Sequence, residues 1–343
     1  MKDIKVSLKG LKPYRPNKQS YLIKLDANES KNYLFESGIQ LSMSEINLYP
    51  DTDSVFLRAR IGAYISTRPE LIIAGNGSSE MIELVLKTYV DKGDVVLSFE
   101  PSFSMYGIYT KIHNGTYIPV QTDDTFKLDI DQMIAAAKTY DPKIIFICSP
   151  NNPTGQMISN QDIKKLLDAT EALVCVDEAY LEFTRKQSSM IDQVEAYDNL
   201  VVLRTMSKAF GLAGIRLGYL ISNQNVVDTL NRVKSPYNLN TLTQHIGTIA
   251  LSQPDKVMAY ITEIITQRAF VEDALKSLKI TYYPSEANFV FFKSEVIDLF
   301  DQLLKKGILV RAFSGTLQNY YRVTIGNKEE NEQFIDALKE IIK

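Results

Sequence analysis

The sequence contains few of the residues on which metal and histidine chemistry depend. Only two histidines, His113 and His245, and two cysteines, Cys148 and Cys175, occur in its 343 residues. None of them has metal-ligand spacing, and both cysteines lie in apolar runs typical of buried strands. This scarcity argues against a zinc enzyme and against a hydrolase built on a histidine base, and we predict no metal site.

Long basic runs and long apolar stretches are also missing from the sequence. No basic run exceeds a dipeptide, and the formal net charge is −3, which disfavours nucleic acid or an anionic membrane surface as a partner. No apolar stretch approaches the roughly 20 residues that span a bilayer. The first seven residues, MKDIKVS, are polar and lack the apolar core of a signal peptide. We therefore expect a cytoplasmic chain that acts on small molecules.

The length and the pattern of apolar runs predict a two-domain α/β protein. The 343 residues exceed the roughly 250 to 300 at which one core stops growing. Near-continuous apolar runs alternate with helical segments, as in a doubly wound, mostly parallel sheet. Strands are expected at 95–99, 144–148, 173–176, 201–203 and 217–221. We predict an N-terminal arm over 1–47 that joins the small domain, a large domain over 48–245 and a small α+β domain over 246–343.

A glycine turn follows the first expected strand of the large domain. Residues 71–86 combine a short apolar run, the turn Gly-Asn-Gly-Ser-Ser and a helical pattern. Ser78 or Ser79 is expected to cap that helix, and the free amides of its first turn suit a phosphate group. The glycine spacing matches neither a dinucleotide-binding fingerprint nor a Walker loop.

Polar residues follow three of the expected strands where the strands end. Asn152 follows 144–148, Asp177 ends the next strand with Tyr180 three residues later, and Lys208 follows 201–203. Ligands of open α/β sheets bind at this carboxyl edge. A carboxylate that keeps a pyridine nitrogen protonated, two donors for a phenolate oxygen and an amine suit pyridoxal phosphate. Asp177 alone is equally compatible with a helix cap or a metal ligand.

Lys208 is the central candidate. Partial burial and the nearby charges of Arg204 and Arg216 are expected to lower its pKa toward neutrality. A neutral amine is the nucleophile that forms a Schiff base with an aldehyde. Thr205, Ser207 and Arg216 supply hydroxyls and a guanidinium for a phosphate. The plain alternative is a surface lysine in a glycine-rich loop.

Two arginines in adjacent expected strands form a second candidate. Arg311 and Arg322 interrupt the apolar runs 308–311 and 321–326. Buried guanidinium groups are costly without anions, so we interpret the pair as a clamp for an anionic substrate. Salt bridges to acidic residues elsewhere in the chain are the alternative.

Three segments carry a resemblance to a known family. Residues 149–155 (SPNNPTG), 176–180 (VDEAY) and 204–219 (RTMSKAFGLAGIRLGY) resemble class II pyridoxal-phosphate aminotransferases of fold type I, and within them the histidinol-phosphate aminotransferases. The resemblance covers nearly the whole chain. It implies a homodimer with shared active sites.

The resemblance also implies a role for each candidate residue. Lys208 would form the internal aldimine and Asp177 would pair with the pyridinium, with Tyr180 as a further catalytic residue. The remaining residues implied for the cofactor are Asn152, Phe103, Ser78, Ser79, Thr205, Ser207, Arg216 and Tyr49, the last from the other subunit. Those implied for substrate are Tyr14, Asn28, Arg311 and Arg322. Ser79 and Phe103 depart from the family's usual acidic residue and tyrosine.

The implied reaction is ping-pong transamination between histidinol phosphate and 2-oxoglutarate, giving imidazole acetol phosphate and glutamate in histidine biosynthesis. Two alternatives remain open, and the second of them shares every cofactor residue. An aromatic amino acid aminotransferase would use the arginine pair for an α-carboxylate, and a lyase similar to threonine-phosphate decarboxylase would release carbon dioxide.

Overall fold

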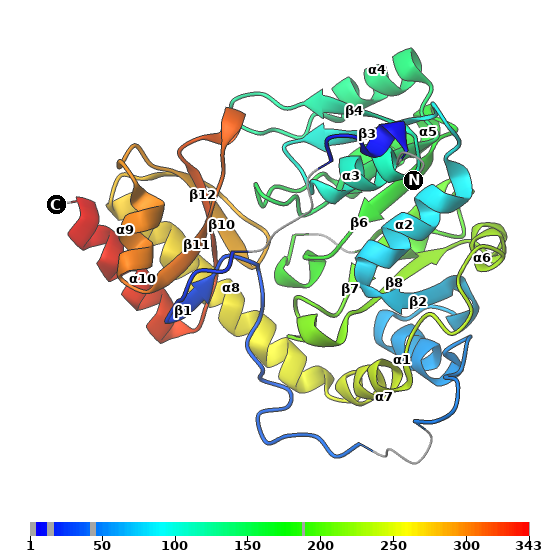
Figure 1. Cartoon of the computed structure of the whole chain (residues 1–343), viewed down its shortest axis with the longest axis horizontal. Coiled ribbons are helices and arrows are strands. Elements are labelled where there is room, and N and C mark those ends of the chain that lie inside the picture. The colour runs from blue at the N-terminus through cyan, green and yellow to red at the C-terminus, as the bar shows by residue number, and fades with distance from the viewer. Residues whose placement is uncertain (1–4, 12–16, 42–45, 187–188, 343) are drawn as a thin grey trace.

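The chain folds around two β-sheets that lie side by side, with the long helix α8 (Pro254–Ser277) running between them (Figure 1). The computed structural model describes residues 5–11, 17–41, 46–186 and 189–342. No helix in those ranges is long and apolar enough to cross a membrane.

In the described part of the chain the larger sheet has seven strands, in the order β2-β8-β7-β6-β5-β3-β4. Neighbours from β7 through β4 pair in parallel, whereas β8 is antiparallel to both β7 and β2. The predicted mostly parallel α/β sheet is confirmed, although the alternation of strands with α-helices stops after β6, where only 3-10 turns precede β7 and β8. The strands are β2 (Ile72–Asn76), β3 (Val95–Glu100), β4 (Thr116–Gln121), β5 (Ile144–Cys148), β6 (Leu173–Asp177), β7 (Leu200–Thr205) and β8 (Leu217–Ser222).

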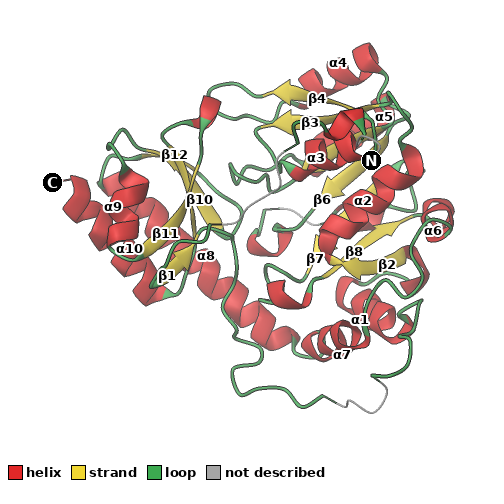
Figure 2. Ribbon diagram, viewed as in Figure 1, coloured by secondary structure: helices red, strands yellow, loops and turns green. Residues whose placement is uncertain are grey.

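Helices cover both faces of this sheet, as Figure 2 shows. Because side chains alternate along a strand, Ile145 and Ile147 of β5 belong to one core cluster and Ile144 and Phe146 to the other. Both faces therefore exclude water, which explains why the central strands are apolar throughout. The helices around this sheet are α1 (Val55–Ile65), α2 (Gly77–Tyr89), α3 (Met105–Ile112), α4 (Ile130–Tyr140), α5 (Asn160–Ala169), α6 (Gln224–Asn231) and α7 (Thr241–Ala250).

The predicted capping of α2 by a serine is wrong. The helix begins at Gly77, two residues earlier than a cap at Ser78 requires, and its N-cap residue is Asn76. The Glu80 carboxylate folds back to accept hydrogen bonds from the Asn76 backbone and side chain. Ser78 and Ser79 thus lie in the first helical turn, so their amides still belong to the helix N-terminus.

The smaller sheet has the strand order β1-β11-β12-β10-β9 among the described residues. The pair β1 and β11 is parallel and the other pairs are antiparallel. The first strand comes from the N-terminal arm, where the sequence suggested no strand. The elements are β1 (Ile23–Leu25), β9 (Thr281–Tyr283), β10 (Phe289–Lys293), β11 (Ile308–Ala312) and β12 (Tyr320–Thr324), with α8, α9 (Leu299–Lys305) and α10 (Lys328–Ile342) against them. The domain boundaries near 47 and 245 remain predictions.

Strand register brings the candidate segments to one edge of the larger sheet. The last residues of β5 and β6, Cys148 and Asp177, are paired. Gly218 at the start of β8 pairs with Thr205 at the end of β7 and with Gly75 near the end of β2. The loops that follow β2, β5, β6 and β7 therefore leave the sheet at the same edge.

Candidate active site

Asp177 lies at the carboxyl end of β6 with 3% of its surface exposed. Its Oδ1 accepts from the Ala179 amide at 3.1 Å, and its Oδ2 accepts from the Tyr106 hydroxyl at 2.8 Å. Burial raises the pKa of Asp177, while these two hydrogen bonds and the charge of Lys208 act in the opposite direction. The carboxylate is thus fixed in place before any ligand arrives.

Lys208 follows β7 and is half-buried. Its Nζ donates to the Ala27 carbonyl at 3.1 Å and lies 5.6 Å from the centre of the Tyr180 ring. Burial lowers the pKa of Lys208 to about 7, with the positive charge of Arg322 as the next contribution. A large share of this amine is therefore neutral at physiological pH, as a nucleophile requires.

The sequence-based role of Arg204 in this shift is wrong. The guanidinium of Arg204 is buried between Glu178 at 3.0 Å and Glu182 at 3.1 Å, so its charge is neutralised locally. The cationic neighbours that lower the pKa of Lys208 are Arg322, Arg216 and Lys24. Arg204 instead ties the residue after Asp177 to the strand that leads to Lys208.

At the glycine turn, where the sequence predicts a site for a phosphate group, the backbone of β8 and the first turn of α2 approach each other closely. A Cβ on Gly218 would lie 2.2 Å from the Ser78 nitrogen, and one on Gly77 would lie 2.5 Å from Arg216 Nη2. Arg216 Nη1 donates to the Ser207 hydroxyl at 3.3 Å. The exposed guanidinium of Arg216 therefore lies beside the first turn of α2, where free amides and the helix dipole favour an anion.

Thr205 makes two local contacts that the sequence did not predict, and its predicted role toward a phosphate remains a prediction. Its hydroxyl donates to the Leu217 carbonyl at 3.3 Å and accepts from the Ser207 amide at 3.1 Å. In this arrangement it shapes the loop between β7 and β8, and Ser207 is the hydroxyl that meets Arg216.

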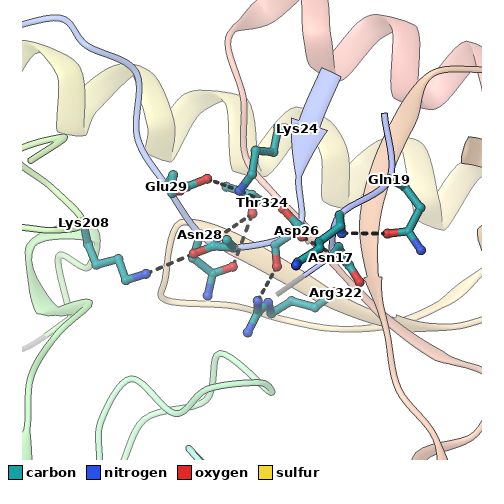
Figure 3. Close-up of polar contacts among 11 residues, drawn as sticks. Asn17, Gln19, Lys24, Asp26, Asn28, Glu29, Lys208, Arg322 and Thr324 are labelled. Atoms are coloured by element: carbon teal, nitrogen blue, oxygen red, sulfur yellow. Dashed lines mark hydrogen bonds and ion pairs between the residues drawn. The ribbon is translucent and has the colours of Figure 1, made fainter. Parts of the chain in front are cut away.

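The segment 26–28 of the arm joins both sheets at the site, as Figure 3 shows. Asn28 donates from Nδ2 to the Tyr180 hydroxyl at 3.1 Å, and its backbone amide donates to Thr324 Oγ1 at 2.9 Å. Tyr180 and Asn28 are both buried. Asn28, expected beside the substrate, thus also orients the Tyr180 hydroxyl.

Arg322 reaches the same place from the smaller sheet. Its Nη2 donates to the Asp26 carbonyl at 2.7 Å (Figure 3). Its Nη1 donates to Asn152 Oδ1 at 2.5 Å. Arg311 pairs directly opposite Arg322 across β11 and β12, so both side chains leave the same face of that sheet. The predicted adjacency of the two arginines is confirmed, and the roles of both remain predictions.

Three other predicted site residues are Phe103, Tyr49 and Tyr14, and only the first two lie among the described residues. Phe103 is half-buried, and its ring meets the Tyr106 ring edge-on at 5.5 Å. Tyr49 is 81% exposed and stacks on Tyr237. Tyr14 lies outside the described residues.

Sequence reasoning missed the hydroxyl of Tyr106 as a partner of Asp177. The two residues lie 71 positions apart, and no local pattern links them. The one signal in the sequence was the short spacing of Phe103, just before α3, and Tyr106 in its first turn, whose rings meet edge-on.

Comparisons with known proteins agree with this geometry. The family model "Aminotransferase class I and II" matches residues 21–338. A histidinol-phosphate aminotransferase of Caldanaerobacter subterraneus subsp. tengcongensis is 40% identical over 348 residues, covering 99% of this chain and 98% of the relative. Another, of Thermoanaerobacter sp., is 38% identical with the same coverage. The crystal structure of the Sinorhizobium meliloti histidinol-phosphate aminotransferase with pyridoxal-5'-phosphate has a TM-score of 0.91 and 20% identity, covers 100% of this chain and 98% of its own, and supports the fold.

We predict that Gly218→Ala weakens binding of inorganic phosphate at least about tenfold, because the new Cβ must push the first turn of α2 away from Arg216. Isothermal titration calorimetry measures the change. Gly214→Ala is the matched control, because an added Cβ there meets nothing within 4 Å. Equal phosphate affinity in Gly218→Ala and wild type would show that this close approach does not form the anion site.

Proposed function

The chain belongs to the class I and II aminotransferase family, and from this premise we propose that it transfers the amino group of histidinol phosphate to 2-oxoglutarate in histidine biosynthesis. One observation carries the proposal: an amine with a pKa of about 7 and a guanidinium donate hydrogen bonds to the carbonyls of two consecutive residues. Lys208 donates to Ala27 and Arg322 to Asp26. One site thus offers a nucleophile and an anion-binding group.

The cofactor of this reaction is pyridoxal 5'-phosphate, and the residues present fit it. Its aldehyde needs a neutral amine, its ring nitrogen a carboxylate, and its phosphate a cluster of amides and a cation. The backbone approach at Gly77 and Gly218 leaves room for the phosphate only because neither residue has a side chain. We assign its binding to Lys208, Asp177, Tyr180, Asn152, Phe103, Ser78, Ser79, Thr205, Ser207, Arg216 and, from a second copy, Tyr49.

When bound, this cofactor supplies a protonated ring that withdraws electrons from the substrate Cα. The protein contributes position and proton transfer. Lys208 Nζ, with a pKa of about 7, is suited to take the proton from the substrate Cα and to deliver it to the aldehyde-derived carbon of the cofactor, where the amino group would stay. The Tyr180 hydroxyl, which accepts from Asn28, keeps its own proton for donation to an oxygen in the site.

The arginine pair accounts for two anionic substrates in one site. Histidinol phosphate and glutamate each carry an anion away from the reacting nitrogen. Arg322, whose guanidinium is now held by Asn152 and the Asp26 carbonyl, and Arg311 opposite it are assigned to that anion. Asn28 and Tyr14 complete the proposed substrate residues.

An exposed apolar surface supports a homodimer as the working form. Leu48, Tyr49, Val55 and Phe56 are 60%, 81%, 52% and 82% exposed, and Tyr237 stacks on Tyr49. Exposed apolar groups gathered in this way mark protein interfaces. We call these five residues the apolar surface and propose that a second copy covers it.

A cytoplasmic location is also part of the proposal. The thiols of Cys148 and Cys175 are both free and buried. Reduced cysteines are typical of a reducing compartment, which supports this location.

We predict that histidinol phosphate converts the cofactor-loaded protein to its pyridoxamine form in a single turnover, and that 2-oxoglutarate reverses the change while glutamate appears. Lys208→Ala should slow this at least about 100-fold, because it removes the proton-transferring amine. Absorption spectroscopy measures both. Lys165→Ala, at an exposed position on α5, is the control. Conversion by phenylalanine alone, or release of carbon dioxide from phosphothreonine, would instead identify the aromatic aminotransferase or the lyase.

We further predict that Phe56→Glu raises the dimer dissociation constant at least about 30-fold, because it places a charge on the most exposed side chain of the apolar surface. Sedimentation velocity measures the shift. Ile297→Glu, at an 80% exposed position outside that surface, should leave the dimer intact. A wild-type protein that sediments as a monomer at micromolar concentration would contradict the proposal.

A further inference from the structure

Tyr106 is a fully buried tyrosine whose hydroxyl points at Asp177. None of its surface is exposed, and the donor-acceptor distance to Asp177 Oδ2 is 2.8 Å. Its ring stacks on Phe146 of β5 with centroids 4.6 Å apart and planes 1° from parallel. The Phe103 ring contacts the Tyr106 ring edge-on. These contacts leave the phenol little freedom to turn elsewhere.

Among the residues that the structure describes, the Asp177 carboxylate has two hydrogen-bond donors. Its two oxygens accept from the Ala179 amide and from the Tyr106 hydroxyl, one each. The titratable groups that face it come from α3, β5, β6, the segment after β6 and the loop after β7, and they are Tyr106, Cys148, Cys175, Tyr180 and Lys208.

Of these groups only Lys208 can carry a positive charge, which it loses as the pH rises through about 7. Burial raises the pKa values of both thiols and of Tyr180, so these groups stay neutral. Burial likewise raises the pKa of Tyr106, which therefore remains a donor at every working pH.

We propose that Tyr106 is a positioning residue that keeps Asp177 ionised and aimed at the ligand by donating its phenolic hydrogen to Oδ2. The proposal rests on the function assigned above to Asp177, that of pairing with the protonated ring nitrogen of the cofactor.

The hydrogen bond has a chemical consequence for that pair. A buried carboxylate without a donor binds a proton more tightly. It would then draw the shared proton away from the ring nitrogen and weaken the ring as an electron acceptor. By stabilising the charged form of Asp177, the Tyr106 hydroxyl leaves the proton on the ring.

The test is an infrared titration of the apoprotein, which requires no turnover. The carbonyl stretch of protonated Asp177 is assigned by its absence in Asp177→Asn. Tyr106→Phe keeps the ring stacked on Phe146 and removes only the hydroxyl. Because hydrogen bonds to charged groups are strong, the acid dissociation constant of Asp177 should fall about tenfold or more in this variant. The band should then persist to a pH about one unit higher than in wild type.

Tyr117→Phe is the matched control. The Tyr117 ring of β4 packs against Gly107 of α3, the helix that also holds Tyr106. It should leave the titration of Asp177 unchanged. The proposal is overturned if Tyr106→Phe moves the midpoint less than twofold in dissociation constant, or if Tyr117→Phe moves it equally.

The experiment separates this inference from the proposed function. Thermal unfolding of each variant establishes that it is folded. Uptake of pyridoxal phosphate by the wild-type apoprotein is measured in parallel by equilibrium dialysis. Failure to take up the cofactor would refute the proposed function and with it the ring-nitrogen role of Asp177, whereas the infrared titration decides separately whether Tyr106 holds the carboxylate ionised.

Discussion

The amine of Lys208, held out of water against the Ala27 carbonyl, is the contact on which the site depends. An ammonium group loses hydration on burial, which lowers the pKa of Lys208, and repulsion from the positive charge of Arg322 lowers it further. The neutral form is therefore accessible near pH 7, and it still needs an acceptor for its hydrogen. The N-terminal arm supplies that acceptor at 3.1 Å, which makes the arm part of the site.

The arm can do this because it is anchored to both sheets. Strand β1 pairs with β11, and Asn28 is bound from three directions. Its amide donates to Thr324, its carbonyl accepts from Asn288 at 3.1 Å, and its side chain donates to Tyr180. The residue has a φ of 55°, a left-handed conformation that asparagine tolerates better than most residues. The chain can thus turn between Tyr180, in the segment after β6, and two residues in or beside strands of the smaller sheet, Thr324 and Asn288.

The sequence predicted the central strands and the residues at their ends well, because a strand buried on both faces has a continuous apolar sequence. It therefore placed Asp177, Tyr180, Asn152 and Lys208 at one edge. It missed β1, whose three residues show no period and pair with residues 308–310 far along the chain. It also misjudged Arg204, because the partners that neutralise it, Glu178 and Glu182, lie more than twenty residues away in sequence. Such long-range polar pairing leaves no periodic signal, and the same reason hid the contact between Tyr106 and Asp177.

The central claim is that Lys208 loses its proton near pH 7, so that about half of the amine is neutral there. Trace labelling of the apoprotein with acetic anhydride at a series of pH values, followed by mass spectrometry of the Lys208 peptide, measures this directly. Since only the neutral amine reacts, labelling should rise with pH, reach half its maximum at about 7 and then level off, whereas Lys165 should react only at far higher pH. A midpoint for Lys208 near that of an ordinary lysine, about 10.4, would contradict the account.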